Sequence, residues 1–193
     1  MQRARGLIEV LDEAWSMLAR GVDDPADDLH WPVLASVGRA ADAHASGSTA
    51  ATGSDSDAGP PGERAFADAR TVVLRASSPE TRSVAVHSDA QAGKVAQLRA
   101  CPAAALVAYH RVRRVQLRLH GTAQVHVDDD VTAATWASLP EHSRALYAGP
   151  QRLCLIRLHI RRLDWLHIGP ERQLRAAFEF DTQGPPNGRW IDP

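Results

Sequence analysis

Apolar residues recur along this chain with two periods, one typical of helices and one typical of strands. Near the N-terminus, leucines return at helical spacing, which predicts an amphipathic helix over residues 6–20 that Gly21 ends. From residue 115 onward, apolar and polar residues alternate, as they do in a strand with one buried face. Short apolar runs separated by turn residues continue the β pattern to the end of the chain.

Most of the chain after residue 70 is predicted to be β. Gly121 and the pair Arg161-Arg162 each interrupt a long alternating run, so we expect a bulge or bend at both places. No long helical crossover separates successive strands, and this favours an antiparallel barrel over a parallel βαβ sheet. The predicted strands are 31–37, 71–74, 83–88, 103–110, 115–127, 153–168 and 174–180, with short helices over 93–100 and 130–139.

One segment departs from this pattern. Between Asp42 and Gly62, nearly every residue is Ala, Ser, Gly, Thr, Asp or Pro, which leaves little to bury. We therefore expect a disordered insertion at 42–62. Too little sequence precedes it to form a separate core, so we predict a single domain over residues 1–193.

Composition and charge narrow the possible functions. The 193 residues carry 22 Lys and Arg against 23 Asp and Glu, so no overall positive charge favours nucleic acid or an anionic membrane. No apolar run reaches the roughly 20 residues that span a bilayer. Acidic residues in the first helix argue against a signal peptide. Two cysteines are too few for a disulfide framework, and we expect a cytoplasmic protein that contains them reduced.

The candidate chemistry lies at strand ends. The chain has no phosphate-loop, zinc-helix or nucleophile-elbow motif, its nine histidines lack metal-ligand spacing, and we predict no metal site. Arg70 and Arg75 open and close one strand, and Ser88 ends the next. Lys94, the only lysine, begins the following helix. A helix N-terminus with Lys94 and a nearby arginine is a candidate site for a phosphate dianion. By spacing alone, ordinary surface charges explain these residues better.

The order of the pieces resembles a known family. The run Arg70-Thr71-Val72-Val73-Leu74-Arg75 precedes Val86-His87-Ser88-Asp89, Lys94, Val115–Gly121 and Trp136–Pro140 with matching gaps. This succession is similar to the FMN-binding split-barrel family, in the branch related to pyridoxamine 5′-phosphate oxidase, from about Pro32 to Pro193. The resemblance implies a mainly β (α+β) fold, a six-stranded antiparallel split barrel with short flanking helices. It also implies a homodimer that holds FMN at the subunit interface.

The resemblance further implies which residues hold the cofactor and the substrate. The family has a tryptophan near the flavin, and its position falls on Trp165. A one-residue shift of the alignment would put Leu166 there instead. Candidate remnants of a pocket for a small-molecule substrate are Arg75 and Ser143. The implied FMN contacts are Arg70, Thr71, Val72, Val73, His87, Ser88, Lys94, Gln116, Trp165 and Arg175.

Departures from the family are concentrated in the substrate pocket. Leu139, Glu171 and Gln173 stand where the family places arginine, arginine and histidine, and Gly93 replaces an arginine beside the cofactor phosphate. We therefore predict an FMN-dependent oxidoreductase of unknown substrate, in which the cofactor carries the chemistry. Two alternatives stay open: an authentic pyridoxamine or pyridoxine 5′-phosphate oxidase, and a non-catalytic flavin- or haem-binding module on the same barrel.

Overall fold

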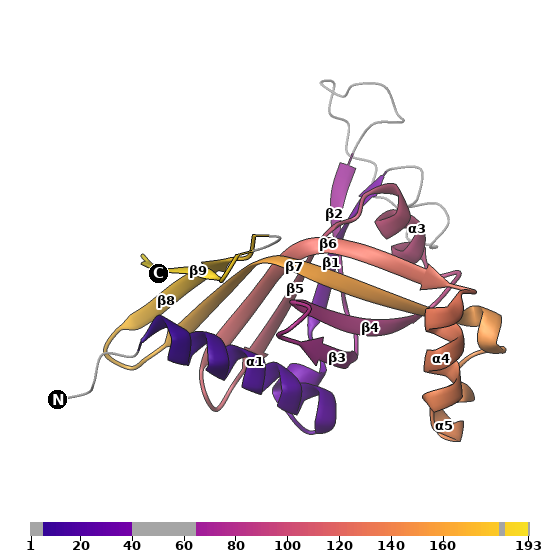
Figure 1. Cartoon of the computed structure of the whole chain (residues 1–193), viewed down its shortest axis with the longest axis horizontal. Coiled ribbons are helices and arrows are strands. Elements are labelled where there is room, and N and C mark those ends of the chain that lie inside the picture. Colours follow the sequence, from indigo (N-terminus) through magenta and orange to yellow (C-terminus); the bar gives the residue numbers. More distant parts are fainter. Residues whose placement is uncertain (1–5, 40–64, 182–183, 193) are drawn as a thin grey trace, which may run out of the picture.

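The computed structural model describes residues 6–39, 65–181 and 184–192, so the predicted insertion lies outside the described residues. These segments form an antiparallel sheet with short helices around it (Figure 1). The predicted class, mainly β with flanking helices, is confirmed, but the sheet contains nine strands rather than six. None of the helices in the described part of the chain combines the length and apolar character needed to cross a membrane.

The elements follow the predicted order. The helices are α1 (Leu7–Asp23), α3 (Gly93–Ala100), α4 (Asp130–Ser138) and α5 (Glu141–Arg144), with 3₁₀ turns η1 (Asp28–His30) and η2 (Pro150–Arg152). The strands are β1 (Val33–Arg39), β2 (Ala65–Thr71), β3 (Leu74–Ser78), β4 (Ser83–Asp89), β5 (Ala103–His110), β6 (Val115–Val127), β7 (Leu153–Ile168), β8 (Gln173–Glu179) and β9 (Asn187–Ile191).

Strand β7 is the place where the sheet divides. Its first half, from Leu153 to His159, pairs with β4, and its second half, from Arg162 to Ile168, pairs with β8. The main path of the sheet is β2-β1-β5-β6-β7-β4-β3, and β9 extends it beyond β8. In Figure 1, α1 runs along one face of the sheet, while α4 and α5 stand at the end where β7 begins.

The division of β7 coincides with a bulge. His120 of β6 is opposite Arg162, but Gly121 is opposite Ile160, so Arg161 is an extra residue without a partner on β6. A Cβ on Gly121 would lie 1.9 Å from the carbonyl oxygen of His159. The two irregularities predicted from the sequence are therefore the two sides of one bulge, and glycine is required there by the close approach of β7.

Helix α1 continues past Gly21, so the predicted helix stop is wrong. The helix buries Val10, Ala14 and Leu18 in the core and ends at Asp23. A Cβ on Gly21 would lie 2.8 Å from the Cβ of Leu29 in η1. This glycine lets η1 pack closely on the helix, and it does not end the helix.

Candidate functional site

Polar side chains from four elements, β1, β2, β4 and α3, meet at one end of the sheet. Lys94, in the first turn of α3, donates from Nζ to Ser88 Oγ at 3.0 Å. Arg70 on β2 donates to Ser36 Oγ at 2.6 Å and to Gln97 Oε1 at 3.0 Å. The charge of Arg70 is close enough to Lys94 to lower the pKa of the lysine. The structure thus brings together three predicted cofactor residues from three different elements: Arg70 of β2, Ser88 of β4 and Lys94 of α3.

Arg70 is held in place by neighbours that the sequence did not single out. Its guanidinium forms an ion pair with Asp68, and Asp68 also accepts from Gln97 Nε2 at 2.9 Å. The Gln97 hydrogen bond and the Arg70 charge lower the pKa of Asp68. Gln97 is almost fully buried and also accepts from Ser36 Oγ at 2.7 Å. The only sequence feature that could have indicated this role is a glutamine, Gln97, placed between the apolar residues Val95 and Leu98 of the predicted helix.

Lys94 has the features of an anion ligand. Burial first, and then the Arg70 charge, lower the pKa of its half-buried ammonium group. Among the described residues, no carboxylate lies within salt-bridge distance of Nζ, and its one hydrogen bond is to Ser88. The N-cap of α3 is Ala92, whose side chain cannot cap the helix. The charges of Asp89 and Asp68 reach Lys94, but neither carboxylate forms an ion pair with it. A cation with no ion pair among the described residues, next to a helix N-terminus, is a favourable site for phosphate.

Space is available in front of this helix. Gly93 is the first residue of α3, and a Cβ built on it would meet no atom within 4 Å. Gly93 therefore leaves open room beside Lys94 among the described residues.

The chain passes between β2 and β3 next to this cluster. Thr71 is the last residue of β2, and Val72 and Val73 form the break before β3. Val72 is buried, and its N–H donates to the carbonyl oxygen of Pro32 at 2.9 Å. The predicted strand over 71–74 is thus the junction of two strands.

The charge of Arg75, one of the two predicted substrate residues, acts on His87 of β4 and on Tyr147. Burial, reinforced by the charge of Arg75, lowers the pKa of His87 to about 4. Burial raises the pKa of Tyr147, and Arg75 opposes that rise. The Tyr147 ring meets Trp136 edge to face at 6.3 Å. Ser143, the other predicted substrate residue, is buried in α5, four positions before Tyr147.

The low pKa of His87 predicts a loss of stability in mild acid. An unfolded histidine takes up a proton near pH 6.5, but folded His87 resists protonation down to about pH 4. The stability that neutral His87 contributes is therefore complete above pH 6.5 and is lost as the pH falls toward 4. Between pH 7 and pH 5, the free energy of unfolding, measured with urea, should fall in the wild type. In His87→Gln we expect that fall to be smaller by about 1–2 kcal/mol.

His142 is exposed, so the His142→Gln exchange is the matched control. Its free energy of unfolding should fall between pH 7 and pH 5 by as much as that of the wild type. Equal pH profiles for wild type and His87→Gln would contradict the depressed pKa.

The remaining predicted cofactor residues lie at the other end of β7. Gln116 on β6 is opposite Leu166, and Leu166 is opposite Arg175 on β8. Residues in register across antiparallel strands share a face, so Gln116 and Arg175 flank Leu166. Trp165 lies on the opposite face, fully buried. Of the two residues considered for the family tryptophan, Leu166 is the one beside Gln116 and Arg175.

Arg175 is oriented by a buried carboxylate that sequence reasoning missed. Asp164 is 3% exposed and accepts hydrogen bonds from Arg118 at 2.6 Å, Arg162 at 3.0 Å and Arg175 at 3.1 Å. The Nε atom of Arg175 is buried and has no hydrogen-bond partner among the described residues. A lone acid within the mostly apolar and basic run of β7 was the only hint in the sequence.

Comparison with protein families gives one match. The family model described as the FMN-binding domain of pyridoxamine 5′-phosphate oxidase matches residues 48–127. This range includes Arg70, Ser88, Lys94 and Gln116, but it ends before Arg175. No curated protein matches the sequence of this chain.

Solved structures resemble the whole chain. A pyridoxamine 5′-phosphate oxidase-related, FMN-binding protein from Nostoc punctiforme PCC 73102 superposes with a TM-score of 0.70 at 19% identity, covering 94% of this chain and 96% of its own. PhzG from Burkholderia lata 383, solved with tetrahydrophenazine-1-carboxylic acid, has a TM-score of 0.57 at 16% identity and covers 99% and 95%. A Clostridium acetobutylicum protein related to general stress protein 26 reaches 0.53 at 7% identity, covering 89% and 95%. At these identities the likeness shows the fold alone.

Proposed function

We propose that this chain is a member of the family whose model, the FMN-binding domain of pyridoxamine 5′-phosphate oxidase, matches residues 48–127. We further propose that it binds FMN and acts as a flavin-dependent oxidoreductase on a small molecule. The observation that carries the proposal is the Lys94 ammonium, which forms no ion pair with a described carboxylate and donates a hydrogen bond to Ser88 beside the N-terminus of α3. The resemblance to the family implies that this lysine contacts the cofactor phosphate.

The residues present fit the cofactor. Lys94, Ser88 and the first N–H groups of α3 would hold the phosphate, while Asp68, Ser36 and Gln97 fix the direction of the Arg70 guanidinium. A bound flavin would supply hydride acceptance and electron transfer. The protein would supply position and charge. Neutral His87 would keep a further positive charge away from the cofactor at physiological pH.

The two groups of predicted cofactor residues call for a second copy of the chain. Ser88 is opposite Cys154 at the start of β7, whereas Arg175 is opposite Leu166 near its end. The strand between Cys154 and Leu166 spans on the order of 40 Å, much longer than one FMN molecule. If both groups contact the same flavin, Arg175 and Lys94 must come from different subunits. We therefore propose a homodimer with FMN at its interface.

The sheet face that carries Gln116 suits such an interface. Tyr109 is opposite Gln116 on β5 and 41% exposed, and Val33 of β1 is 38% exposed. Val33 is opposite Val107, and Val107 is opposite Arg118, so these side chains share one face. The face also carries the polar Gln116 and Arg118. Covering its exposed aromatic and branched side chains with a second copy would gain free energy.

The proposal is tested on protein that has been loaded with FMN and freed of excess flavin. Illumination in the absence of oxygen, with EDTA as electron donor, should bleach the bound flavin, and admitting oxygen should restore the colour. A flavin that cannot be reduced would remove the oxidoreductase assignment and leave a binding module. Release of pyridoxal 5′-phosphate from pyridoxine 5′-phosphate would instead identify an authentic vitamin oxidase, against the expectation from Leu139 and Glu171.

Restoring the missing arginine should strengthen FMN binding. The Gly93→Arg exchange places a guanidinium beside Lys94, and the first side-chain atom meets open space. One added charge-assisted contact to phosphate predicts a dissociation constant about tenfold lower. Quenching of flavin fluorescence measures the change. Gly93→Gln is the control of similar length without charge. If Gly93→Arg and Gly93→Gln bind FMN equally, the phosphate does not lie at this end of α3.

A further inference from the structure

Asp164 joins several arginines on the sheet face that carries Gln116. Arg118 of β6 is opposite Asp164, and Gln116, two positions before Arg118, is opposite Leu166. Arg118 and Arg175 each donate from Nη2 to the same oxygen atom, Asp164 Oδ2, at 2.6 Å and 3.1 Å. Their charged groups are therefore neighbours. The Asp164 cluster consists of this carboxylate and the guanidinium groups of Arg118, Arg162 and Arg175.

The Asp164 cluster has an excess of positive charge. Arg162 donates to Asp164 Oδ1 at 3.0 Å and has a second acidic partner, Glu179, at 3.0 Å. Within residues 6–39, 65–181 and 184–192, Arg118 and Arg175 form no ion pair except with Asp164. Two guanidinium charges thus share one carboxylate charge as their only counterion. The cluster can therefore stabilise a further negative charge placed beside it.

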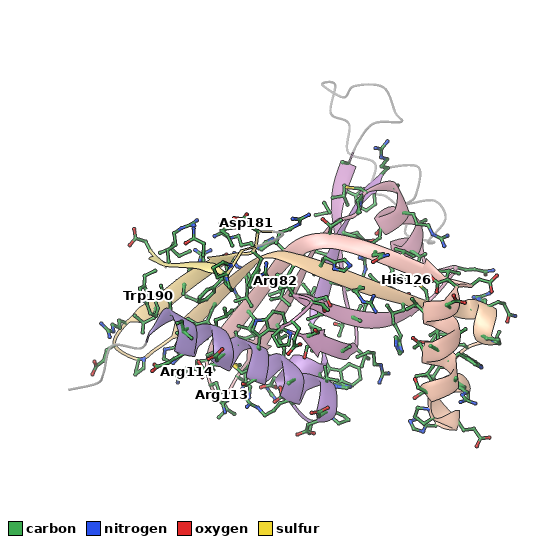
Figure 2. All side chains as sticks on the ribbon, in the orientation of Figure 1. Arg82, Arg113, Arg114, His126, Asp181 and Trp190 are labelled. Atoms are coloured by element: carbon green, nitrogen blue, oxygen red, sulfur yellow. The ribbon has the colours of Figure 1, made fainter. Side chains whose placement is uncertain are left out.

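The excess charge is on the side of the sheet where FMN is proposed to bind. The other side of the same strands is filled by indole rings, because Trp190, labelled in Figure 2, packs edge to face on the buried Trp165 at a centroid distance of 6.4 Å. The side chains of Arg118 and Arg175 are 33% and 23% exposed, whereas that of Asp164 is 3% exposed. The two arginines can therefore contact a bound molecule, and Asp164 can act on it only through them and through its charge.

Positive charge beside a flavin makes the flavin easier to reduce. Addition of two electrons and one proton converts the neutral flavin ring into an anion, so a nearby cation stabilises the reduced form more than the oxidised form. The reduction potential of the bound flavin rises as a result. The effect is larger at a partly buried site than in water, because the local dielectric constant is lower.

We propose that the Asp164 cluster sets the reduction potential of the bound flavin. Arg118 and Arg175 raise the potential by placing positive charge beside the flavin ring. Asp164 is a positioning residue, which holds the two guanidinium groups side by side and offsets part of their charge. The inference rests on the proposed FMN site, and it assigns roles to Arg118 and Asp164, which the family resemblance leaves without one.

The test measures the reduction potential of FMN bound to the full chain, against a reference dye in the absence of oxygen. Arg118→Gln should weaken the binding of reduced FMN about tenfold more than that of oxidised FMN, which lowers the potential by about 30 mV. Arg118→Lys keeps the charge and should stay close to the wild type. Arg20→Gln removes an exposed charge from α1, on the other side of the sheet, and is the matched control. Its potential should equal that of the wild type.

Asp164→Asn keeps an acceptor for the guanidinium groups but removes the negative charge, so the potential should rise. A purely structural role of Asp164 would weaken the binding of both flavin forms equally and leave the potential unchanged. Arg118 is partly exposed, so its variants provide the result if Asp164→Asn does not fold.

FMN titration of every protein precedes the measurement of its potential. Bound FMN with the wild-type potential in Arg118→Gln overturns this inference alone, and so does a potential that is unchanged or lower in folded Asp164→Asn. A wild-type chain that binds no FMN overturns the proposed function together with this inference.

Discussion

Replacing Lys94 with alanine is expected to weaken FMN binding about 100-fold, which corresponds to about 2.7 kcal/mol. Lys94 is half-buried and has no carboxylate within salt-bridge distance among the described residues, so its charge is available to a phosphate. Arg70 already forms an ion pair with Asp68, so its charge cannot fully replace that of Lys94. A charge-assisted contact at a partly buried site is worth more than a surface ion pair. Titration of flavin fluorescence at fixed ionic strength measures the loss.

The control is Arg99→Ala, which removes a positive charge from the exposed side of the same helix. We expect less than a threefold change, because a solvated charge is screened by salt. Riboflavin, which lacks the phosphate, should bind wild type and Lys94→Ala equally. A Lys94→Ala protein that holds FMN as tightly as the wild type would remove the phosphate site from α3.

Replacing Gly121 with alanine is expected to lower the free energy of unfolding by about 3 kcal/mol or more. The added methyl group would lie 1.9 Å from the carbonyl oxygen of His159, a backbone atom that cannot rotate away. To remove this clash, β6 and β7, the longest strand pair, would have to separate at the bulge. Urea unfolding measures the loss, and Gly93→Ala, where a Cβ meets open space, should cost less than 1 kcal/mol. Equal stability of the two variants would contradict the close approach of the strands.

Strong local patterns allowed the sequence to predict part of the fold. The helix over 93–100 and the strands over 103–110, 115–127 and 153–168 have the predicted bounds. Residues 65–78 form two strands because the chain changes direction at Val72 and Val73, inside a run of only three apolar residues where periodicity gives no signal. Strand β9 was missed because Asn187–Ile191 is short, contains a glycine and does not alternate.

The site was less predictable because its geometry depends on long-range register. Ser88 and Lys94, six residues apart at a strand end and a helix start, were predicted from the resemblance to belong to one cofactor site, and the structure adds their hydrogen bond. The pairing of Arg70 with Ser36 joins β2 to β1 across the segment 40–64, and nothing local encodes it. Asp164 meets Arg118 and Arg175 only because β6, β7 and β8 align in one register.

The most direct test of the central claim is an absorption spectrum of the purified chain, mixed with FMN and passed through a gel-filtration column. We predict that flavin absorption bands elute together with the protein at the volume of a dimer, in a ratio of one FMN per chain. A colourless protein peak, with all of the FMN in the low-molecular-weight fraction, would contradict the claim that Lys94 and Ser88 form a flavin phosphate site.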